Sequence, residues 1–294
     1  MSPPPRDNQR AILIMLAAVG VFTLMDGGLK QLTAHYPPLE VAALRGGASL
    51  PLVLPWAFAT AGWRSLLRVR WSLHLLRAVI GVSMMGAFIY AVHRMPLSGV
   101  YAIFFVAPLM ITALSVPILG ERVGPQRWAA IAVGFAGVLV ALHPSGKGMD
   151  VLAGLAILLA AFGYAVSAIT VRVLARTDSP QAMVAWLLVL LTLGAGACAW
   201  PGWVAILPSD YALIAGVGLA GALGQYAITA AFIRGEASVL APLEYTALAW
   251  SLLLDFFLWK TLPGPATWVG AAIIVVSGLY LLRREKVHVE SEHP

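Results

Sequence analysis

The sequence predicts an all-α membrane protein of ten transmembrane helices, arranged as two inverted five-helix repeats around a central cavity. Three observations support this fold class: a shortage of charge, ten long apolar segments, and a second half that resembles the first. Of the 294 residues, 60% are hydrophobic and only 11% are charged, whereas soluble domains carry about 25% charged residues. So few charges cannot cover a water-facing surface, and they fall between the apolar segments, as in membrane proteins.

Ten segments have the length and composition of membrane-spanning helices, because a helix needs about 20 mostly apolar residues to cross a bilayer. These segments lie near residues 10–30, 39–58, 74–93, 97–118, 126–142, 151–172, 181–200, 209–231, 238–259 and 266–282. The connections between them are short, so no soluble domain is expected. No small-residue cleavage site follows the first segment, which is therefore read as a retained helix.

The distribution of basic residues predicts how the chain is oriented. With ten spans, 14 of the 19 lysines and arginines fall in segments on the side of the termini, and four fall on the other side. Cytoplasmic loops are enriched in these residues, so we expect a multi-pass protein of the bacterial inner membrane with both termini in the cytoplasm. The net charge of +6 is dispersed at helix ends, which indicates contact with lipid head groups and no nucleic-acid partner.

The second half repeats the first. A shift of 140 positions places Ser98 on Ser238 and aligns Gly124-Pro125-x-x-Trp128 with Gly264-Pro265-x-x-Trp268, while a shift of 143 places Pro37 on Pro180. We therefore expect two units, residues 1–145 and 146–294. Because each unit would hold an odd number of helices, the two copies must be inverted, an arrangement typical of secondary transporters with a substrate site near the midplane.

With its duplicated five-helix unit, the sequence resembles the drug/metabolite transporter superfamily, and specifically its EamA family of bacterial exporters. The resemblance covers nearly the whole chain and is carried by Ile118-Leu119-Gly120-Glu121-Arg122, which precedes the Gly-Pro-x-x-Trp pattern. The second copy has Lys260-Thr261 where the first has Gly120-Glu121, so any role of that acid would belong to the first half. The resemblance implies a ten-helix basket with a central cavity.

The resemblance also implies the export of small metabolites, most often amino acids including the aromatic ones, by alternating access. Two alternatives remain open: a transporter of another class, such as nucleosides or sugar phosphates, and a non-transporting membrane scaffold. An enzyme is not expected, because no Walker or His-Glu-x-x-His sequence is present and the histidines are scattered. No cofactor or metal is expected, and a monomer suffices if the cavity lies between the two repeats.

Ionisable residues inside a bilayer cost about 2.5–3.5 kcal/mol each on insertion scales, so they are candidates for function. Asp26 and Lys30 lie late in the first span, on one helix face, and Glu40 and Arg45 lie early in the second. Arg45 or Lys30 could bind a substrate carboxylate, and Asp26 could bind an ammonium group or a proton. The alternative is an ion-pair network that joins these two helices.

The ninth span carries two acids, Glu244 and Asp255, about three helical turns apart. Glu244 lies either in the cavity, where it could couple transport to protons, or at the interface. Asp255 is expected at the interface or in a pair with Lys260. Pro108 and Pro242 are expected to break the fourth and ninth spans and so to free carbonyl groups beside the cavity.

Transporter pockets combine aromatic walls with a few hydrogen-bonding groups. The residues that offer such groups within the spans are Tyr90, Tyr101, Tyr164, Trp186, Gln225, Tyr245 and Trp250. Trp186 and Trp250 are equally consistent with the cavity and with the aromatic belt at the membrane interface. Gly216-x-Gly218-x-x-Gly221 matches a dinucleotide-binding fingerprint in letters only, because no strand precedes it. These glycines are better explained by close helix contact.

Overall fold

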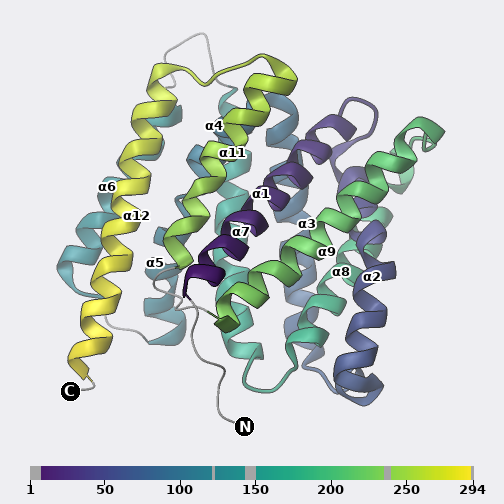
Figure 1. Cartoon of the computed structure of the whole chain (residues 1–294), viewed down its shortest axis with the longest axis horizontal. Helices are drawn as coiled ribbons and strands as arrows, with labels where there is room; N and C mark the ends of the chain where they lie inside the picture. The colour runs from purple at the N-terminus through teal and green to yellow at the C-terminus, as the bar shows by residue number, and fades with distance from the viewer. Residues whose placement is uncertain (1–7, 121–122, 143–149, 235–239, 293–294) are drawn as a thin grey trace.

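The computed structural model describes residues 8–120, 123–142, 150–234 and 240–292, and this part of the chain is entirely helical (Figure 1). The predicted helical fold class is confirmed. In the first half the helices are α1 (Asn8–Leu32), α2 (Pro38–Leu67), α3 (Trp71–Arg94), α4 (Leu97–Phe104), α5 (Ala107–Leu119) and α6 (Pro125–Leu142).

The second half repeats this order with more irregular connections. Its elements are α7 (Val151–Leu174), α8 (Pro180–Ala199), the short turns η1 (Trp200–Gly202) and η2 (Pro208–Asp210), α9 (Tyr211–Arg234), η3 (Ala241–Thr246), α11 (Ala247–Leu254), η4 (Asp255–Trp259) and α12 (Pro265–Glu292). Within the described residues, eight helical stretches are long and apolar enough to cross a membrane, and Pro265–Leu281 is a shorter apolar helix. Together with the broken segment 241–259, they account for the ten predicted spans.

Helices from the two halves pair with each other. The most extensive contacts join α1 to α9, α3 to α7, α2 to α8 and α6 to α12. Because α9 and α7 are the third and first helices of the second half, the contact between α1 and α9 has its counterpart in that between α7 and α3. Exchanging the two halves reproduces the same contacts, as expected for two copies related by a two-fold axis. The start of α1 and the end of α12 lie at one end of the bundle (Figure 1), which we call the terminal face, and the other end is the opposite face.

Among the described residues, a histidine–aspartate clamp between the two halves lies on each face. On the opposite face, His35 Nδ1 and Asp210 Oδ2 are 2.8 Å apart, and the Tyr36 hydroxyl donates to the same carboxylate at 2.8 Å. On the terminal face, His74 Nε2 and Asp178 Oδ2 are 2.9 Å apart. In both clamps the loop after the first helix of one half is bonded to residues beside the second connection of the other half.

Asp178 is a buried acid that remains ionised because neighbouring groups form hydrogen bonds with its carboxylate. Burial acts to raise the pKa of Asp178, but hydrogen bonds from the Thr177 hydroxyl, the Arg70 N–H and His74 outweigh this effect, so the pKa lies below its ordinary value. An ionised carboxylate accepts several hydrogen bonds at once. The clamp on the terminal face therefore holds α3 and the start of α8 together.

Both predicted proline breaks are present. The α-helix α4 ends at Phe104 and α5 begins at Ala107, with Pro108 in its first turn. Proline lacks an N–H, so Pro108 cannot bond the Phe104 carbonyl in helical fashion. In the second half, Pro242 lies in the 3₁₀ turn η3, which precedes α11. Both breaks bring irregular backbone into the interior of the bundle, where packed neighbours shield it from lipid.

Glycine allows α2 and α9 to approach closely. At Gly218 a Cβ atom would overlap the Ala48 carbonyl group of α2, whereas at Gly216, two residues earlier on α9, it would meet nothing within 4 Å. The close-contact interpretation of this glycine motif is thus confirmed at Gly218. No nucleotide-binding turn is formed, because the motif lies inside the helix α9.

Replacing Gly218 by Val should push α9 away from α2. We expect Gly218→Val to lower stability by about 3 kcal/mol, since overpacking against rigid backbone costs 1–3 kcal/mol or more. Thermal unfolding of the purified protein in detergent measures the effect. Gly216→Val, which adds the same side chain on the same helix, is the control, and equal losses for both variants would contradict the assigned contact.

Candidate functional site

Asp26 and Tyr101 meet inside the bundle and join α1 to α4. Both side chains are buried, and the Tyr101 hydroxyl donates a hydrogen bond to Asp26 Oδ2 at 2.6 Å. The Thr23 hydroxyl, one turn earlier on α1, donates to the Val19 carbonyl at 2.9 Å and lies beside Tyr101. Sequence analysis selected Asp26 and Tyr101 independently, from charge and from side-chain type, and the fold places them in contact.

Arg45 lies on α2 beside this pair. Its Nε and Nη1 atoms each approach a methionine sulfur at 3.5 Å, Met25 Sδ and Met85 Sδ respectively. Arg45 is also within electrostatic range of Asp26 and Tyr101. Thioether sulfur is a weak acceptor, so these contacts position the guanidinium group while using little of its hydrogen-bonding capacity. The opposite charges of Arg45 and Asp26 thus lie near each other in an apolar interior.

The ion-pair network predicted between the first two helices does not form among the described residues. Instead, Lys30 contacts Asp255 at 3.5 Å, and Glu40 accepts a hydrogen bond from the Val204 N–H at 2.9 Å. Lys30 and Glu40 therefore have separate partners, while Asp26 and Arg45 remain within electrostatic range of each other. The separation leaves Asp26 and Arg45 available for a ligand that carries charge or hydrogen-bonding groups.

An aromatic cluster continues from Tyr101 across the two helix breaks. The ring centroids of Tyr101 and Phe105 are 5.9 Å apart, and Phe105 and Tyr245 meet edge to face at 4.9 Å. On the other side of α4, Phe104 lies 5.4 Å from Tyr164 of α7. Because Tyr245 and Tyr164 belong to the second half, this cluster joins the two halves at the places where the proline breaks occur.

Glu244 and Tyr245 add polar groups to one end of the aromatic cluster. The Tyr245 hydroxyl is buried without a hydrogen-bond partner among the described residues. Glu244 is exposed and lies within electrostatic range of the Tyr164 and Tyr245 hydroxyl groups. A buried hydroxyl without a partner is costly, so Tyr245 is suited to bond a polar group that enters this region.

Trp250 and Gln225 lie on the second-half helices that flank α1. The Trp250 indole is 40% exposed and packs on Gly20, where a Cβ atom would lie 3.2 Å from the ring carbon Cε2. Gln225 is exposed on α9. The side chain of Trp250 thus covers the middle of α1, within two turns of Asp26.

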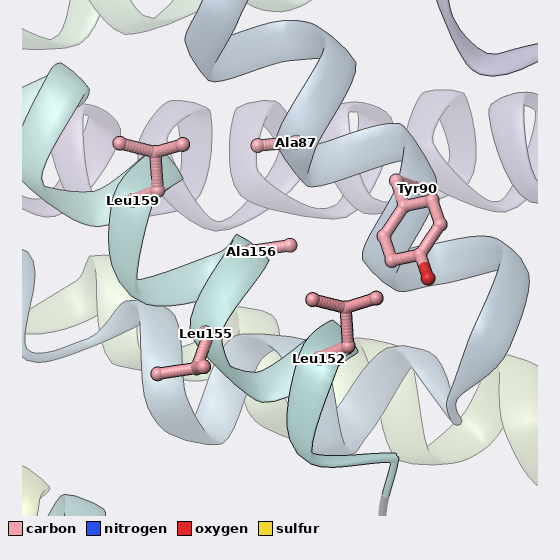
Figure 2. Close-up of a pocket in the computed structure, with 6 residues that line it drawn as sticks. All are labelled: Ala87, Tyr90, Leu152, Leu155, Ala156 and Leu159. Carbon is pink, nitrogen blue, oxygen red and sulfur yellow. The ribbon is translucent and has the colours of Figure 1, made fainter.

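Tyr90 lies away from this cluster, in a shallow apolar pocket between α3 and α7 (Figure 2). The leucines of α7 that line the pocket are mostly exposed, so the pocket opens at the outer surface of the bundle. The Arg94 guanidinium group lies 5.2 Å from the Tyr90 ring centroid. The residues that line the pocket are Ala87, Tyr90, Leu152, Leu155, Ala156 and Leu159.

Trp186 also lies apart from Asp26, toward the terminal face. Its Nε1 donates to the Leu66 carbonyl at 2.7 Å, and its ring meets Trp71 with centroids 4.6 Å apart. Trp186 belongs to a small second core beside Leu66 and Ala182. These contacts give Trp186 a packing role, which neither the cavity nor the belt interpretation anticipated.

The expectation that Asp255 reaches the interface or pairs with Lys260 is wrong. Asp255 is fully buried and accepts hydrogen bonds from the start of α4. Its sequence position suggested the end of a regular helix, but η4 is a π-helical turn that directs the side chain inward. Glu121, the acid of the family pattern, lies outside the described residues.

Sequence reasoning missed three participants in the site: Phe105, Met25 and Met85. An aromatic residue just before a helix-breaking proline was the available signal for Phe105. The two methionines carried no signal, because their role depends on which helices surround Arg45.

Broken helices, a charged pair and an aromatic cluster shared by two inverted halves define the class of a membrane transporter. The sequence profile of the EamA-like transporter family matches residues 9–142 and again residues 151–283. The chain therefore belongs to the EamA-like transporter family and is a secondary transporter of small metabolites, not an enzyme.

Two named transporters and one solved structure are similar to this chain over most of its length. A riboflavin transporter of Rhizobium johnstonii is 30% identical over 287 residues, covering 96% of this chain and 93% of the relative. An S-adenosylmethionine uptake transporter of Rickettsia prowazekii is 27% identical over 264 residues, covering 90% and 89%. One crystal structure matches with a TM-score of 0.63 at 22% identity, covering 93% of this chain and 97% of that one, and shows the same fold.

Removing the Tyr101 hydroxyl should leave the buried Asp26 carboxylate without the hydrogen bond that Tyr101 donates to it. We expect Tyr101→Phe to lower stability by about 2 kcal/mol, within the range for a hydrogen bond to a charged group. Thermal unfolding in detergent measures the loss. Tyr211→Phe, which removes a hydroxyl from an exposed tyrosine, should leave the unfolding temperature unchanged, and an equal change in both variants would contradict this account.

Proposed function

We propose that this chain carries a planar aromatic metabolite with polar substituents, of the riboflavin type, by alternating access between the two repeats. The observation that carries the proposal is the aromatic cluster of Tyr101, Phe105 and Tyr245, which spans both halves at the helix breaks. Aromatic walls bind a planar ring system, and hydrogen-bonding groups at their edges fix its orientation. The riboflavin transporter among the relatives supports the same substrate class.

The polar groups fit the two ends of such a molecule. Asp26 and Arg45 lie beside Tyr101, while Glu244 and the unpartnered Tyr245 hydroxyl lie beyond Phe105. A ring placed against Tyr101 and Phe105 would direct its polar substituents toward one of these sets. In this proposal Tyr164, Trp250 and Gln225 border the path, whereas Tyr90 and Trp186 have packing roles.

A second candidate is the export of amino acids, including aromatic ones. It is favoured by Asp26 and Arg45, whose opposite charges in electrostatic range match the ammonium and carboxylate groups of a zwitterion. Buried charges of this kind require partners, and an amino acid would supply both. We also propose the bacterial inner membrane as the location, with the terminal face toward the cytoplasm, as the basic residues favour.

Purified protein in liposomes should exchange riboflavin. With unlabelled riboflavin inside, we expect uptake of labelled riboflavin to exceed that of empty liposomes by at least about tenfold. Phe105→Ala and Tyr245→Ala should each reduce the exchange by about tenfold, since losing an aromatic contact and its burial costs roughly 1.5 kcal/mol or more. Trp203→Ala, in a loop of the opposite face, is the control.

The same liposomes distinguish the two candidates. Exchange of labelled tryptophan but not riboflavin would favour the amino-acid candidate, and the Asp26→Asn variant should then lose it. Exchange of neither substrate, nor of a nucleoside or a sugar phosphate, by folded protein would contradict both candidates and favour the scaffold alternative.

Glu244 is the proposed coupling acid, because it is exposed and lies within electrostatic range of the Tyr164 and Tyr245 hydroxyl groups. If it carries a proton, an imposed pH gradient should accelerate substrate accumulation several-fold in the parent protein. Glu244→Gln should abolish this acceleration while exchange without a gradient persists. A gradient response that survives in Glu244→Gln and is lost in Asp26→Asn would transfer the coupling role to Asp26.

A further inference from the structure

Asp255 caps a helix that belongs to the other half of the protein. Its Oδ1 accepts the Leu97 N–H at 2.9 Å, and its Oδ2 accepts the Ser98 N–H at 2.7 Å and the Ser98 hydroxyl at 2.6 Å. These are the first N–H groups of α4, which have no partner within the helix. A carboxylate at this position also interacts favourably with the helix dipole.

Lys30 completes the cluster from α1. Its Nζ atom lies 3.5 Å from Asp255 Oδ1, donates to the Met95 carbonyl at 3.1 Å, and sits 4.4 Å from the centroid of the Trp259 ring. Only 12% of the Lys30 side chain is exposed. One compact cluster thus joins the end of α1, the junction before α4 and the π-helical turn η4 on the opposite face.

This cluster lies directly over the candidate site. Lys30 is one turn beyond Asp26 on α1, and Ser98 is one turn before Tyr101 on α4. The contacts therefore form two successive layers between the same helices. Lys30, Asp255 and Ser98 make the outer layer, and Asp26 and Tyr101 make the inner one.

The two positions of the first and second repeats that align with Asp255 and Lys30 are uncharged. The shift of 140 places Asp255 on Ser115, and the shift of 143 places Lys30 on Val173. The Ser115 hydroxyl donates to the Thr112 carbonyl of its own helix at 2.9 Å. The backbone nonetheless corresponds, because Lys260 and Gly120, aligned by the same shift, both have left-handed conformations, with φ of 52° and 72°.

A left-handed conformation is unfavourable for lysine but not for glycine. Lys260 directly follows the π-helical turn η4, and the Thr261 N–H bonds the Asp255 carbonyl at 3.1 Å. Single π-helical turns occur often at functional sites. The cluster on the opposite face is therefore attached to a segment that departs from regular helix geometry, as expected where a helix end moves.

We propose that Lys30, Asp255 and the first turn of α4 form the latch that closes the transport path on the opposite face, and that this latch opens once in each transport cycle. The inference rests on the alternating access proposed above. Because the terminal face has Ser115 and Val173 at the equivalent places, the latch makes the state closed on the opposite face the more stable one. Each variant that weakens the latch shifts the population toward the state open on that face.

Access of a thiol reagent to the inner layer tests the latch without any substrate. In a Cys198→Ser background, a Thr23→Cys probe places a thiol beside Tyr101, in a position that is fully buried in this structure. A membrane-impermeant maleimide is applied to oriented vesicles from the opposite face. A Ser209→Cys probe, in the exposed loop of that face, identifies the orientation and sets the maximal labelling rate.

We expect Lys30→Met and Asp255→Asn each to raise the labelling rate of Thr23→Cys by about tenfold, the shift produced by losing one charge-assisted hydrogen bond. Ser98→Ala, which removes one hydroxyl and leaves every charge, should raise it by about threefold. The control is Arg94→Gln, which breaks the exposed pair with Asp150 on the same face and should leave labelling unchanged.

Three results would contradict the latch. The first is an unchanged labelling rate in folded Ser98→Ala and Lys30→Met. The others are an equal rise of the labelling rate in Arg94→Gln, or an equal rise when the maleimide is applied from the terminal face. The last result would mean that the cluster supports the fold in general. If neither charge variant folds, the labelling rate of Ser98→Ala still tests the latch. Labelling needs no transported molecule, so a wrong substrate class would leave this outcome intact and would show only in the liposome exchange.

Discussion

The structure depends on the pairing of helices of one half with helices of the other half. Lipid offers no hydrogen bonds to a bare backbone, so every polar backbone group must be satisfied within the protein. The contacts of α1 with α9 and of α7 with α3 surround the two broken segments with packed helices. Without this exchange between halves, the backbone near Pro108 and Pro242 would face hydrocarbon, and the path proposed there could not exist.

Inverted pairing also explains why the functional groups gather where they do. The helix breaks of the two halves approach each other, and Phe105 of the first break contacts Tyr245 of the second. The charged residues, however, do not follow the symmetry of the two halves. Asp26 and Arg45 belong to the first half, and Glu244 and Asp255 belong to the second, while their repeat mates are apolar or neutral. Such asymmetry is what a carrier needs if its two end states are to differ in energy.

Three of the described ion pairs differ in where they lie and in what they join. His35 with Asp210 and His74 with Asp178 tie loops at the two faces and maintain the frame, whereas Lys30 with Asp255 joins three helices over the candidate site. Charged contacts in an apolar interior are strong when complete and costly when broken. They therefore suit both tasks, and the surrounding backbone distinguishes them: the two clamps lie in or beside connections between helices, and the third contact lies on a π-helical turn.

The sequence by itself determined the number of spans, the inverted repeat, the proline breaks and the family, because each depends on local composition or on periodic patterns along the chain. It also supplied Asp26, Tyr101, Glu244 and Tyr245, since polar residues in apolar spans are conspicuous. Only the tertiary structure decided that Asp26 meets Tyr101, that Trp186 packs beside Trp71, and that Asp255 turns inward to cap α4. Those outcomes depend on which helix faces meet, within one half or across the two, and such contacts join residues 75 or more positions apart, where no local pattern along the chain indicates them.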